Sequence, residues 1–286
     1  MLIKLFTVYV YLQAMFCGCG SDRRNSDFVR LRKAYRVEVQ RIGRLDSRIS
    51  ESSGLAFASD STFWTHSDGG SLNELYLFNL KGELLQTVPL QVPNRDWEDL
   101  AEDEQGQLYI GDFGNNANNR QNLQVYKLQP ETRTVDDTIR FSYADQTEFP
   151  PPRPERHYDL EGFLYHTDSL YLFTKSRALC KTITKRYSLP AKGGEYTLAP
   201  QEELRVKSPI TAAAMSPAQD QFALLGYGRL YLFEMEDGRV NFSGKRSCLP
   251  IARTGQAEAI LYLSPDQLLI TNENGKMYLV TVSSKK

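Results

Sequence analysis

Five related segments recur along the chain, and this internal repeat constrains its fold more than any other feature. Each segment begins with small or acidic residues, continues into an apolar run, passes a turn rich in Asp, Ser, Pro or Gly, and ends a second apolar run on polar residues. The segments are ESSGLAFASDSTFWTHSDGG from residue 51, DWEDLAEDEQGQLYIGDFGNN from 96, LEGFLYHTDSLYLFTKS from 160, TAAAMSPAQDQFALLGYG from 211 and AEAILYLSPDQLLITNENG from 257. Two apolar runs around such a turn indicate a β-hairpin, so the sequence predicts five hairpins.

A third apolar run follows every hairpin and keeps the units in register. The central residues of these runs lie 48, 61, 46 and 47 residues apart, at Phe78, Tyr126, Tyr187, Phe233 and Val280. Fourth strands are predicted in LLQTVPLQV, DTIRFSY, EELRVK and RVNFSG, whereas the fifth unit ends without one. The alternating segment AYRVEVQRIG, residues 34 to 43, can supply that strand and close a ring.

These units predict an all-β protein, a single β-propeller of five four-stranded blades closed by its N-terminal strand. A sixth blade has room only in the long interval between the second and third units. The prolines of DQTEFPPPRPERHYD in that interval disfavour central strands, because proline has no backbone N–H to donate. No segment shows extended helical periodicity, so we expect little helix.

The charge balance and the first residues bear on partners and location. The chain has 34 basic and 35 acidic residues, so no basic surface suited to nucleic acid is expected. Residues 1–19 combine Lys4, the apolar run LFTVYVYLQAMF and the sequence CGC. This run is too short to span a bilayer comfortably, and the pattern predicts a signal peptide. It resembles a bacterial lipoprotein signal, which implies a lipidated Cys19; Cys17 and a plain secretory signal remain alternatives.

The rest of the chain divides into two parts. Residues 20–33 are polar and predict a tether, and residues 34–286 form the propeller domain. We expect a monomer in the bacterial cell envelope, on the outer-membrane, periplasmic or surface side, attached to the membrane by its lipid alone. The two remaining cysteines, Cys180 and Cys248, can form a disulfide in an oxidising compartment.

A polar site is predicted at one mouth of the central channel. In a propeller, the first residue of each hairpin and the last residue of its second strand converge at the same mouth. The first set is Glu51, Glu98, Glu161, a position near Ala212, and Glu258; the second is Asp68, Asp112, Thr174, Gly226 and Asn272. Like charges held close together raise one another's pKa or require a cation.

Oxygen ligands of this kind favour a hard divalent ion, Ca²⁺ first and Mg²⁺ second. The predicted metal ligands are Glu51, Glu98, Glu161, Glu258, Asp68, Asp112 and Asn272. The alternative is that these side chains only hold the blades together around a water-filled channel.

Cationic side chains occur in the loops expected around this mouth. We predict that a small anionic ligand is held by Arg95, Arg156, His157 and Lys175, and the same loops carry Arg120, Arg153, Arg177 and Arg253. Ordinary salt bridges with the neighbouring acids are the alternative account of these residues.

The sequences ESSGLA, NRDWEDLAEDEQGQLYIGDFGNN, YDLEGF and QAEAI resemble the SdiA-regulated proteins and the esterase-like domain of phytases, two related groups of secreted bacterial propellers. The similarity extends over about residues 35 to 284. It implies a calcium-type ion in the channel and, on the phytase side, phosphoester hydrolysis with Glu98 or Glu161 accepting a proton from water. The small residues TAAAMS of the fourth unit depart from this pattern and interrupt the ring.

Two functions therefore remain open. The first is an envelope propeller that binds a divalent cation together with a small anionic ligand, a glycan or an envelope protein. The second is a metal-dependent hydrolase of phosphoesters or related small esters, with Glu98 and Glu161 as its catalytic residues.

Overall fold

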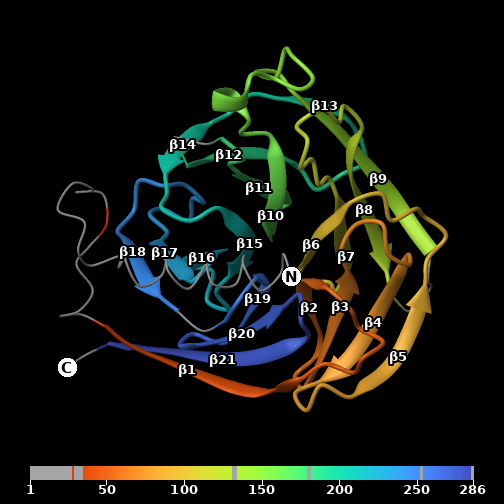
Figure 1. The fold of residues 1–286 in the computed structure, drawn as a ribbon, viewed down its shortest axis with the longest axis vertical. Coiled ribbons are helices and arrows are strands. Elements are labelled where there is room, and N and C mark those ends of the chain that lie inside the picture. Colours follow the sequence, from red (N-terminus) through yellow and green to blue (C-terminus); the bar gives the residue numbers. More distant parts are fainter. Residues whose placement is uncertain (1–27, 29–34, 131–133, 179–181, 252–253, 285–286) are drawn as a thin grey trace.

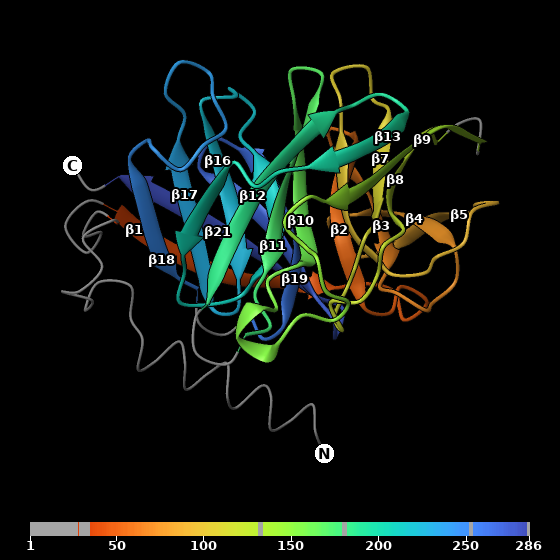
Figure 2. The same ribbon diagram turned by 90° about the horizontal axis from the view of Figure 1, so that it is seen from above.

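The computed structural model describes residues 28, 35–130, 134–178, 182–251 and 254–284. Five small sheets stand around a common axis, and their innermost strands run along that axis (Figures 1 and 2). The described residues contain a single 3-10 turn, η2 (Arg153–Glu155), in the proline-rich interval where a sixth blade had room. The predicted all-β propeller of five blades is confirmed.

Within each blade, neighbouring strands pair antiparallel from the axis outward. Blade 1 contains β2 (Ser52–Ser59), β3 (Thr62–Ser67), β4 (Glu74–Asn79) and β5 (Leu84–Pro89). Blade 2 contains β6 (Trp97–Glu102), β7 (Leu108–Asp112), β8 (Leu123–Gln129) and β9 (Thr134–Tyr143). Blade 3 contains β10 (Asp159–His166), β11 (Ser169–Lys175), β12 (Ile183–Pro190) and β14 (Glu202–Arg205). Blade 4 contains β15 (Ile210–Met215), β16 (Gln221–Gly226), β17 (Arg229–Glu234) and β18 (Arg246–Pro250).

The N-terminal strand closes the ring, as the sequence predicts. Blade 5 contains β19 (Ala257–Ser264), β20 (Gln267–Asn272) and β21 (Lys276–Ser284), and its outer strand is β1 (Tyr35–Arg44). β1 lies antiparallel beside β21, with Val39 opposite Val280 (Figure 1). Every strand of the ring therefore lies within residues 35–284.

Two outer strands differ from the prediction. The segment RVNFSG of blade 4 forms a turn, in which Asn241 Oδ1 accepts hydrogen bonds from the backbone N–H and the hydroxyl of Ser243, and the outer strand is β18 instead. Such local side-chain bonds compete with a strand for the backbone donors. In addition, β13 (Gly194–Leu198) leaves blade 3 and pairs parallel with β9, so blade 2 gains a fifth strand.

The hydrophobic core lies between the blades. Each of five buried clusters joins two neighbouring blades, because the side chains of each sheet alternate between its two faces. Phe173 on β11 of blade 3, for example, stacks on Phe222 on β16 of blade 4, with ring centroids 5.7 Å apart. Burial of these faces against one another fixes the blades around the axis.

Several sequence predictions concern residues outside the described part of the chain. These are the signal peptide, nearly all of the tether, Cys17, Cys19, Cys180 and Arg253. Cys248 is disulfide-bonded. No helix formed by the described residues has the length and apolarity needed to cross a membrane.

Candidate metal centre at one mouth of the channel

Strand pairing shows which residues are equivalent in the five blades. At the polar mouth, the opposed pairs are Ser52 and Ser67, Trp97 and Asp112, Leu160 and Thr174, Ile210 and Gly226, and Ala257 and Asn272. The next residues of the innermost strands are Ser53, Glu98, Glu161, Thr211 and Glu258. Three glutamates, rather than the predicted four, therefore occupy this position.

Glu51 does not lie at the channel mouth, where the alignment of the five repeated units predicted it. It is exposed, precedes β2, and is not among the residues that line the cavity at this mouth. The spacing of 14 residues from Glu98 to Asp112 recurs from Ser53 to Ser67, so Glu51 corresponds instead to Asp96. Because the repeats were aligned at their first acidic residue, the predicted alignment of blade 1 was wrong by two residues: Ser53, not Glu51, is equivalent to Glu98.

The residues that follow the second strands complete the polar mouth. Three of them, Asp68, Tyr227 and Glu273, directly follow β3, β16 and β20. The fourth, Lys175, is the last residue of β11. Together with the three glutamates they enclose a cavity of about 210 Å³. Its remaining lining residues are Asn116, Arg177 and Gln256.

Asp112 and Asn272, two of the predicted ligands, do not line this cavity. Asp112 is buried, and its carboxylate lies 3.1 Å from Arg120 Nη2 and accepts a hydrogen bond from the Tyr126 hydroxyl. Asn272 accepts a hydrogen bond from the backbone N–H of Lys276 at 2.9 Å, in the turn between β20 and β21. Both side chains stabilise the fold around the mouth.

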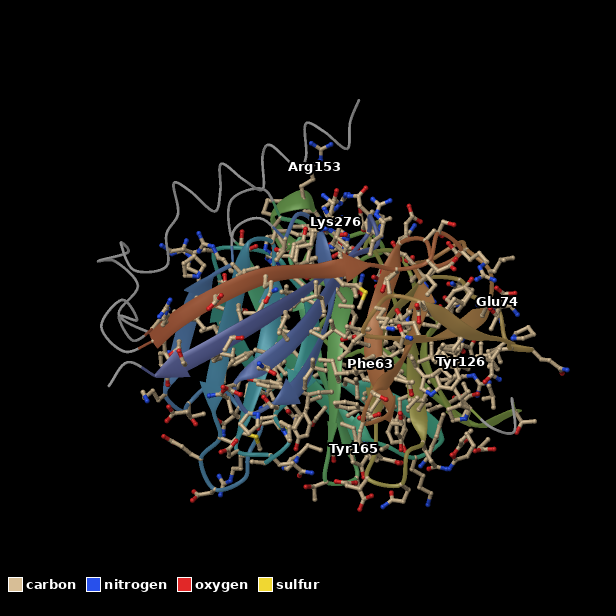
Figure 3. The ribbon with its side chains drawn as sticks, turned by 90° about the horizontal axis from the view of Figure 1, so that it is seen from below. Phe63, Glu74, Tyr126, Arg153, Tyr165 and Lys276 are labelled. Carbon is tan, nitrogen blue, oxygen red and sulfur yellow. The ribbon has the colours of Figure 1, made fainter. Side chains whose placement is uncertain are left out.

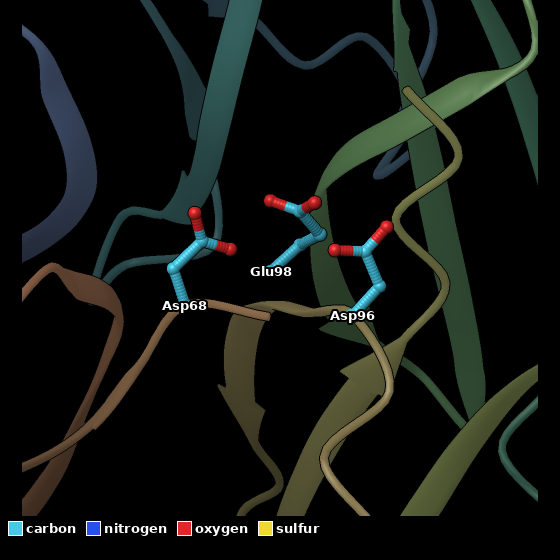
Figure 4. Close-up of side chains that lie close together, drawn as sticks. All are labelled: Asp68, Asp96 and Glu98. Atoms are coloured by element: carbon cyan, nitrogen blue, oxygen red, sulfur yellow. The ribbon is translucent and has the colours of Figure 1, made fainter. Parts of the chain in front are cut away.

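One side of the mouth, which we call the acidic half, consists of Asp68, Asp96 and Glu98. One carboxylate oxygen of each lies within 4.8 Å of the others, and the three side chains point into the same space (Figure 4). Glu98 is only 4% exposed, yet within the described residues its carboxylate forms no hydrogen bond and no ion pair. The nearest cation is Arg120, whose Nη1 lies 4.0 Å from Asp96 Oδ2.

The other side, the paired half, consists of Asp159, Glu161 and Glu258 with two cations. Lys175 Nζ lies 2.8 Å from Glu161 Oε2 and 4.0 Å from Glu258 Oε1. The Arg177 guanidinium donates to Asp159 Oδ2 at 2.5 Å and to Glu161 Oε1 at 3.0 Å. The Tyr227 hydroxyl donates to Glu258 Oε1 at 2.7 Å. The chain itself thus neutralises these carboxylates.

Burial and mutual repulsion raise the pKa values of the carboxyl groups. Burial raises the pKa of Glu98 well above its usual range, and repulsion from Glu161, Asp68, Asp159 and Asp96 raises it further. Burial likewise raises the pKa of Asp68 to about 7. Burial, followed by repulsion from Glu258, raises that of Glu273 to about 8. The mouth therefore takes up protons at neutral pH unless a cation balances its charge.

The loop after β7 and the centre of the channel shape the site. A Cβ atom on Gly114 would lie 2.2 Å from Glu98 Oε1 and 2.5 Å from the Asp96 carboxylate carbon, so a larger residue here would displace these side chains. Below the mouth, the fully buried Asp99 accepts hydrogen bonds from the backbone N–H groups of Leu100, Phe163 and Ala213. Asp99 thus joins blades 2, 3 and 4 at the axis.

The other four blades carry small residues at the position of Asp99. These are Gly54, Gly162, Ala212 and Ala259, and we call this layer the plug. A Cβ atom on Gly54 would lie 2.5 Å from Leu100 N, and one on Gly162 would lie 2.8 Å from the Ala212 carbonyl carbon. The backbones therefore touch at this layer. Ala212 belongs to the plug and leaves no gap in the polar ring.

One of the four cations predicted to hold a ligand lines the cavity. Lys175 does so, whereas Arg95, Arg156 and His157 do not. Arg156 Nε donates to the Pro151 carbonyl, and His157 Nδ1 lies 2.8 Å from Ser176 Oγ. Arg177 provides the second cation of the cavity.

The sequence comparison missed Asp96, Asp159, Tyr227 and Glu273 as residues of this mouth. A usable signal exists, because Asp96 with Glu98 and Asp159 with Glu161 repeat an acid-x-acid pattern at the start of β6 and β10. Gln256 with Glu258 and Glu51 with Ser53 are weaker versions of the same pattern. Tyr227 gives no such signal, since only the packing of blade 4 against blade 5 places it beside Glu258.

Comparison with known proteins supports the fold. No protein-family model and no curated protein sequence matches the chain significantly. Among solved structures, the chain is similar to the PQQ-bound aldose sugar dehydrogenase of Streptomyces coelicolor, with a TM-score of 0.53 and 10% identity over 87% of this chain and 99% of the other. At this identity the likeness shows the fold alone.

Two further structures are similar at lower TM-scores. A gluconolactonase of Xanthomonas campestris has a TM-score of 0.45 and 12% identity over 86% of this chain and 90% of the other. Virginiamycin B lyase of Staphylococcus aureus has a TM-score of 0.41 and 12% identity over 81% of this chain and 66% of the other. The resemblance to the SdiA-regulated and phytase-like groups is not confirmed by these comparisons.

Proposed function

We propose that the polar mouth binds one divalent cation in its acidic half and, beside it, a small anionic ligand. The observation that carries the proposal is Glu98, a buried carboxylate between two groups of acids with no hydrogen bond or ion pair within the described chain. A carboxylate in that position needs a proton or a cation, since an unpaired buried charge is strongly unfavourable.

The donor set fits a hard cation. Asp68, Asp96 and Glu98 would hold it, because they offer carboxylate oxygens alone and lie together without a local lysine. Ca²⁺ is the preferred ion and Mg²⁺ the second choice, since both take oxygen ligands. Such an ion, when bound, supplies positive charge that attracts and polarises an anionic oxygen.

The paired half supplies the rest of an anion-binding site. The Arg177 side chain is 33% exposed and lies in the cavity wall, so its guanidinium is accessible to an anion. Lys175 is buried between Glu161 and Glu258, and its charge is largely balanced by them. We therefore propose that Arg177 positions a carboxylate or phosphate group of the ligand. Lys175 instead holds Glu161 and Glu258 together through its ion pairs.

Hydrolysis of a small phosphoester is the second candidate function, consistent with the resemblance to the phytase-like group. Two catalytic glutamates were predicted, and their surroundings distinguish them. Burial raises the pKa of both carboxyl groups, but Glu161 is engaged by Lys175 and Arg177, whereas Glu98 forms no ion pair within the described residues. In this function Glu98 accepts the proton of an attacking water, and Glu161 orients the two cations.

We also propose that the protein acts in the bacterial cell envelope, attached by a lipid on Cys19. This rests on the signal-like sequence of residues 1–19. A small anionic molecule is the ligand that the polar mouth favours, while a glycan or an envelope protein with an acidic group is the larger alternative.

A calcium titration tests the metal centre. The chain from residue 20, which contains every strand of the ring, is treated with chelator and melted at increasing Ca²⁺ concentration. We expect a saturable rise in melting temperature, worth about 2.7 kcal/mol at a hundredfold excess over Kd, since the ion binds only the folded state. Glu98→Gln should abolish the rise, whereas Glu104→Gln, an exposed glutamate at the other end, should retain it.

The same proteins decide between the two functions. An equal rise in all three, or none in the wild type, would contradict the metal centre. If the chain hydrolyses a small phosphomonoester, Glu98→Gln should lower kcat by about 10²- to 10⁴-fold. Binding of the ester without turnover, abolished by Arg177→Ala, would identify a binding protein.

A further inference from the structure

A second cavity lies at the opposite mouth of the channel. It has a volume of about 320 Å³ and is lined by the final residues of all five innermost strands, β2, β6, β10, β15 and β19. Figure 3 shows Tyr165, one of its lining residues, at the face opposite Arg153 and Lys276. A volume of this size is at the lower end of the range for small-molecule sites.

This cavity is separate from the metal centre. The plug layer, with Asp99 at its centre, lies between the two, and the innermost strands touch one another there. No residue lines both cavities. A ligand at the second mouth therefore has no contact with Asp68, Asp96 or Glu98.

The chemistry of the second cavity is apolar with acidic groups. Its walls include Leu55, Ala101, Leu164, Met215 and Leu261, all buried or half-buried. Its charged lining residues are Glu102, Asp103 and Glu104, and the lining contains no Lys, Arg or His. An anion is disfavoured at such a mouth, whereas a cation with an apolar body matches both features.

The three acids are not equivalent. Asp103 accepts hydrogen bonds from the backbone N–H groups of Gln105 and Gln107 and from the Tyr109 hydroxyl, so it stabilises its own turn. Glu104 is exposed at the rim and accepts a hydrogen bond from Gln219. Glu102 is half-buried, and its carboxylate accepts a hydrogen bond from the backbone N–H of Phe57, but within the described residues no lysine or arginine pairs with it.

We propose that this cavity binds a small organic ammonium ion with an aliphatic or aromatic body. The ammonium group pairs with the Glu102 carboxylate, and the apolar body lies against Leu164, Met215 and Leu261. The ion pair is favourable here because Glu102 has no cation of its own and its apolar surroundings exclude most of the competing water.

The rim limits the size of this ligand. Gln219 Nε2 donates to Glu104 Oε1 at 3.3 Å, which joins the hairpin turn of blade 4 to that of blade 2. These two blades are not neighbours in the ring, so the contact crosses part of the mouth. We therefore expect compact amines to enter more readily than a peptide or a polysaccharide chain.

A ligand series on the wild-type chain tests the proposal without any substitution. Hexylammonium, hexanol and hexanoate share one apolar body and differ in charge, and calorimetry on the chain from residue 20 measures each affinity. We expect hexylammonium to bind at least tenfold more tightly than hexanol and hexanoate not to bind. Equal or tighter binding of hexanol, or no binding of hexylammonium at millimolar concentration, would overturn the proposal.

Two variants then locate the site. Glu102→Gln should weaken hexylammonium at least tenfold and leave hexanol unchanged, which also shows that the variant is folded. Glu195→Gln, an exposed glutamate outside this cavity, should change the affinity less than threefold. Glu98→Gln should keep full amine affinity, so that failure of the metal centre and failure of this site are distinguishable. An unchanged hexylammonium affinity in Glu102→Gln would refute the assignment.

Discussion

The two mouths of the channel are built from the same five strands, yet they carry opposite chemistry. At the polar mouth, the beginnings of β6, β10 and β19 bring glutamates together with two cations. At the other mouth, the ends of the five innermost strands present leucine, alanine and methionine around one half-buried glutamate. Position along one strand therefore decides whether a carboxylate meets other acids or apolar side chains.

The pKa and the ion pairing of each carboxylate depend on the side chains that surround it. Glu161 has two cations and is neutralised, while Glu98 has other acids and no cation. Glu102 lies among apolar side chains beside Asp103, without a cation in the described residues, and burial raises its pKa to about 7. The same residue type thus stabilises the fold at one position and, in our two proposals, binds a metal ion or an organic cation at others, depending on what faces it.

The largest effect is expected at the plug that divides the two mouths. Asp99→Leu removes the acceptor of the Leu100, Phe163 and Ala213 N–H groups, and leaving such buried donors unpaired costs about 1–3 kcal/mol each. We expect the free energy of unfolding to fall by about 3–6 kcal/mol, measured with urea.

Asp99→Asn is the matched control, since it keeps one carbonyl acceptor and should lose about half as much. A loss of less than about 1 kcal/mol in Asp99→Leu would show that the plug does not depend on these bonds.

A smaller effect is expected within the polar mouth. Lys175→Met leaves Glu161 and Glu258 without their lysine, and removing one partner of a buried pair costs about 3–5 kcal/mol. We expect Ca²⁺ to restore part of the lost stability. We also expect it to bind at two equivalents instead of one, because Glu161 and Glu258 then lack a lysine, as the carboxylates of the acidic half do.

Calorimetry gives the stoichiometry, and urea unfolding gives the stability. Lys245→Met is the control: its pair with Glu234 is exposed and should contribute less than about 1 kcal/mol. An unchanged stoichiometry in Lys175→Met would mean that the two halves differ in more than their cations.

The smallest effect concerns pH. Asp68, with a pKa of about 7, and Glu273, with a pKa of about 8, hold protons in the folded state that they lose in the unfolded state. The folded chain therefore binds more protons between about pH 5 and 8, and its stability falls as pH rises through this range.

We expect the melting temperature of the chelated chain to decrease from pH 5 to pH 8, and added Ca²⁺ to reverse the decrease at pH 8 but not at pH 5. A melting temperature that is flat or rises over this interval without Ca²⁺ would contradict the raised pKa values.

Most of the fold could be predicted from the sequence because its signals are local. Alternating residues and turn clusters determine hairpins, and the spacing of Phe78, Tyr126, Tyr187, Phe233 and Val280 counts the blades. The prediction failed where side-chain hydrogen bonds to the backbone competed with strand pairing. RVNFSG alternates like a strand, but its Asn and Ser side chains bond the backbone of a turn.

The site was predictable only in part, since it depends on register across distant strands. The sequence identified Glu98, Glu161, Glu258, Asp68 and Lys175, all of which line the cavity. It included Glu51, although the spacing of 14 residues from Ser53 to Ser67 matches Glu98 to Asp112 and places Glu51 two positions too early. It also missed Asp96 and Asp159, which stand two residues before Glu98 and Glu161 and lie beside them at the mouth.

The sequence by itself determined the number of blades, the closing strand and the acidic character of one channel mouth. These properties follow from periodicity and composition, which are written along the chain. Only the tertiary structure decided which carboxylates receive Lys175 and Arg177 and which, like Glu98 and Glu102, do not. Pairing depends on distances of a few ångströms between blades, and those distances exist only once the ring has closed.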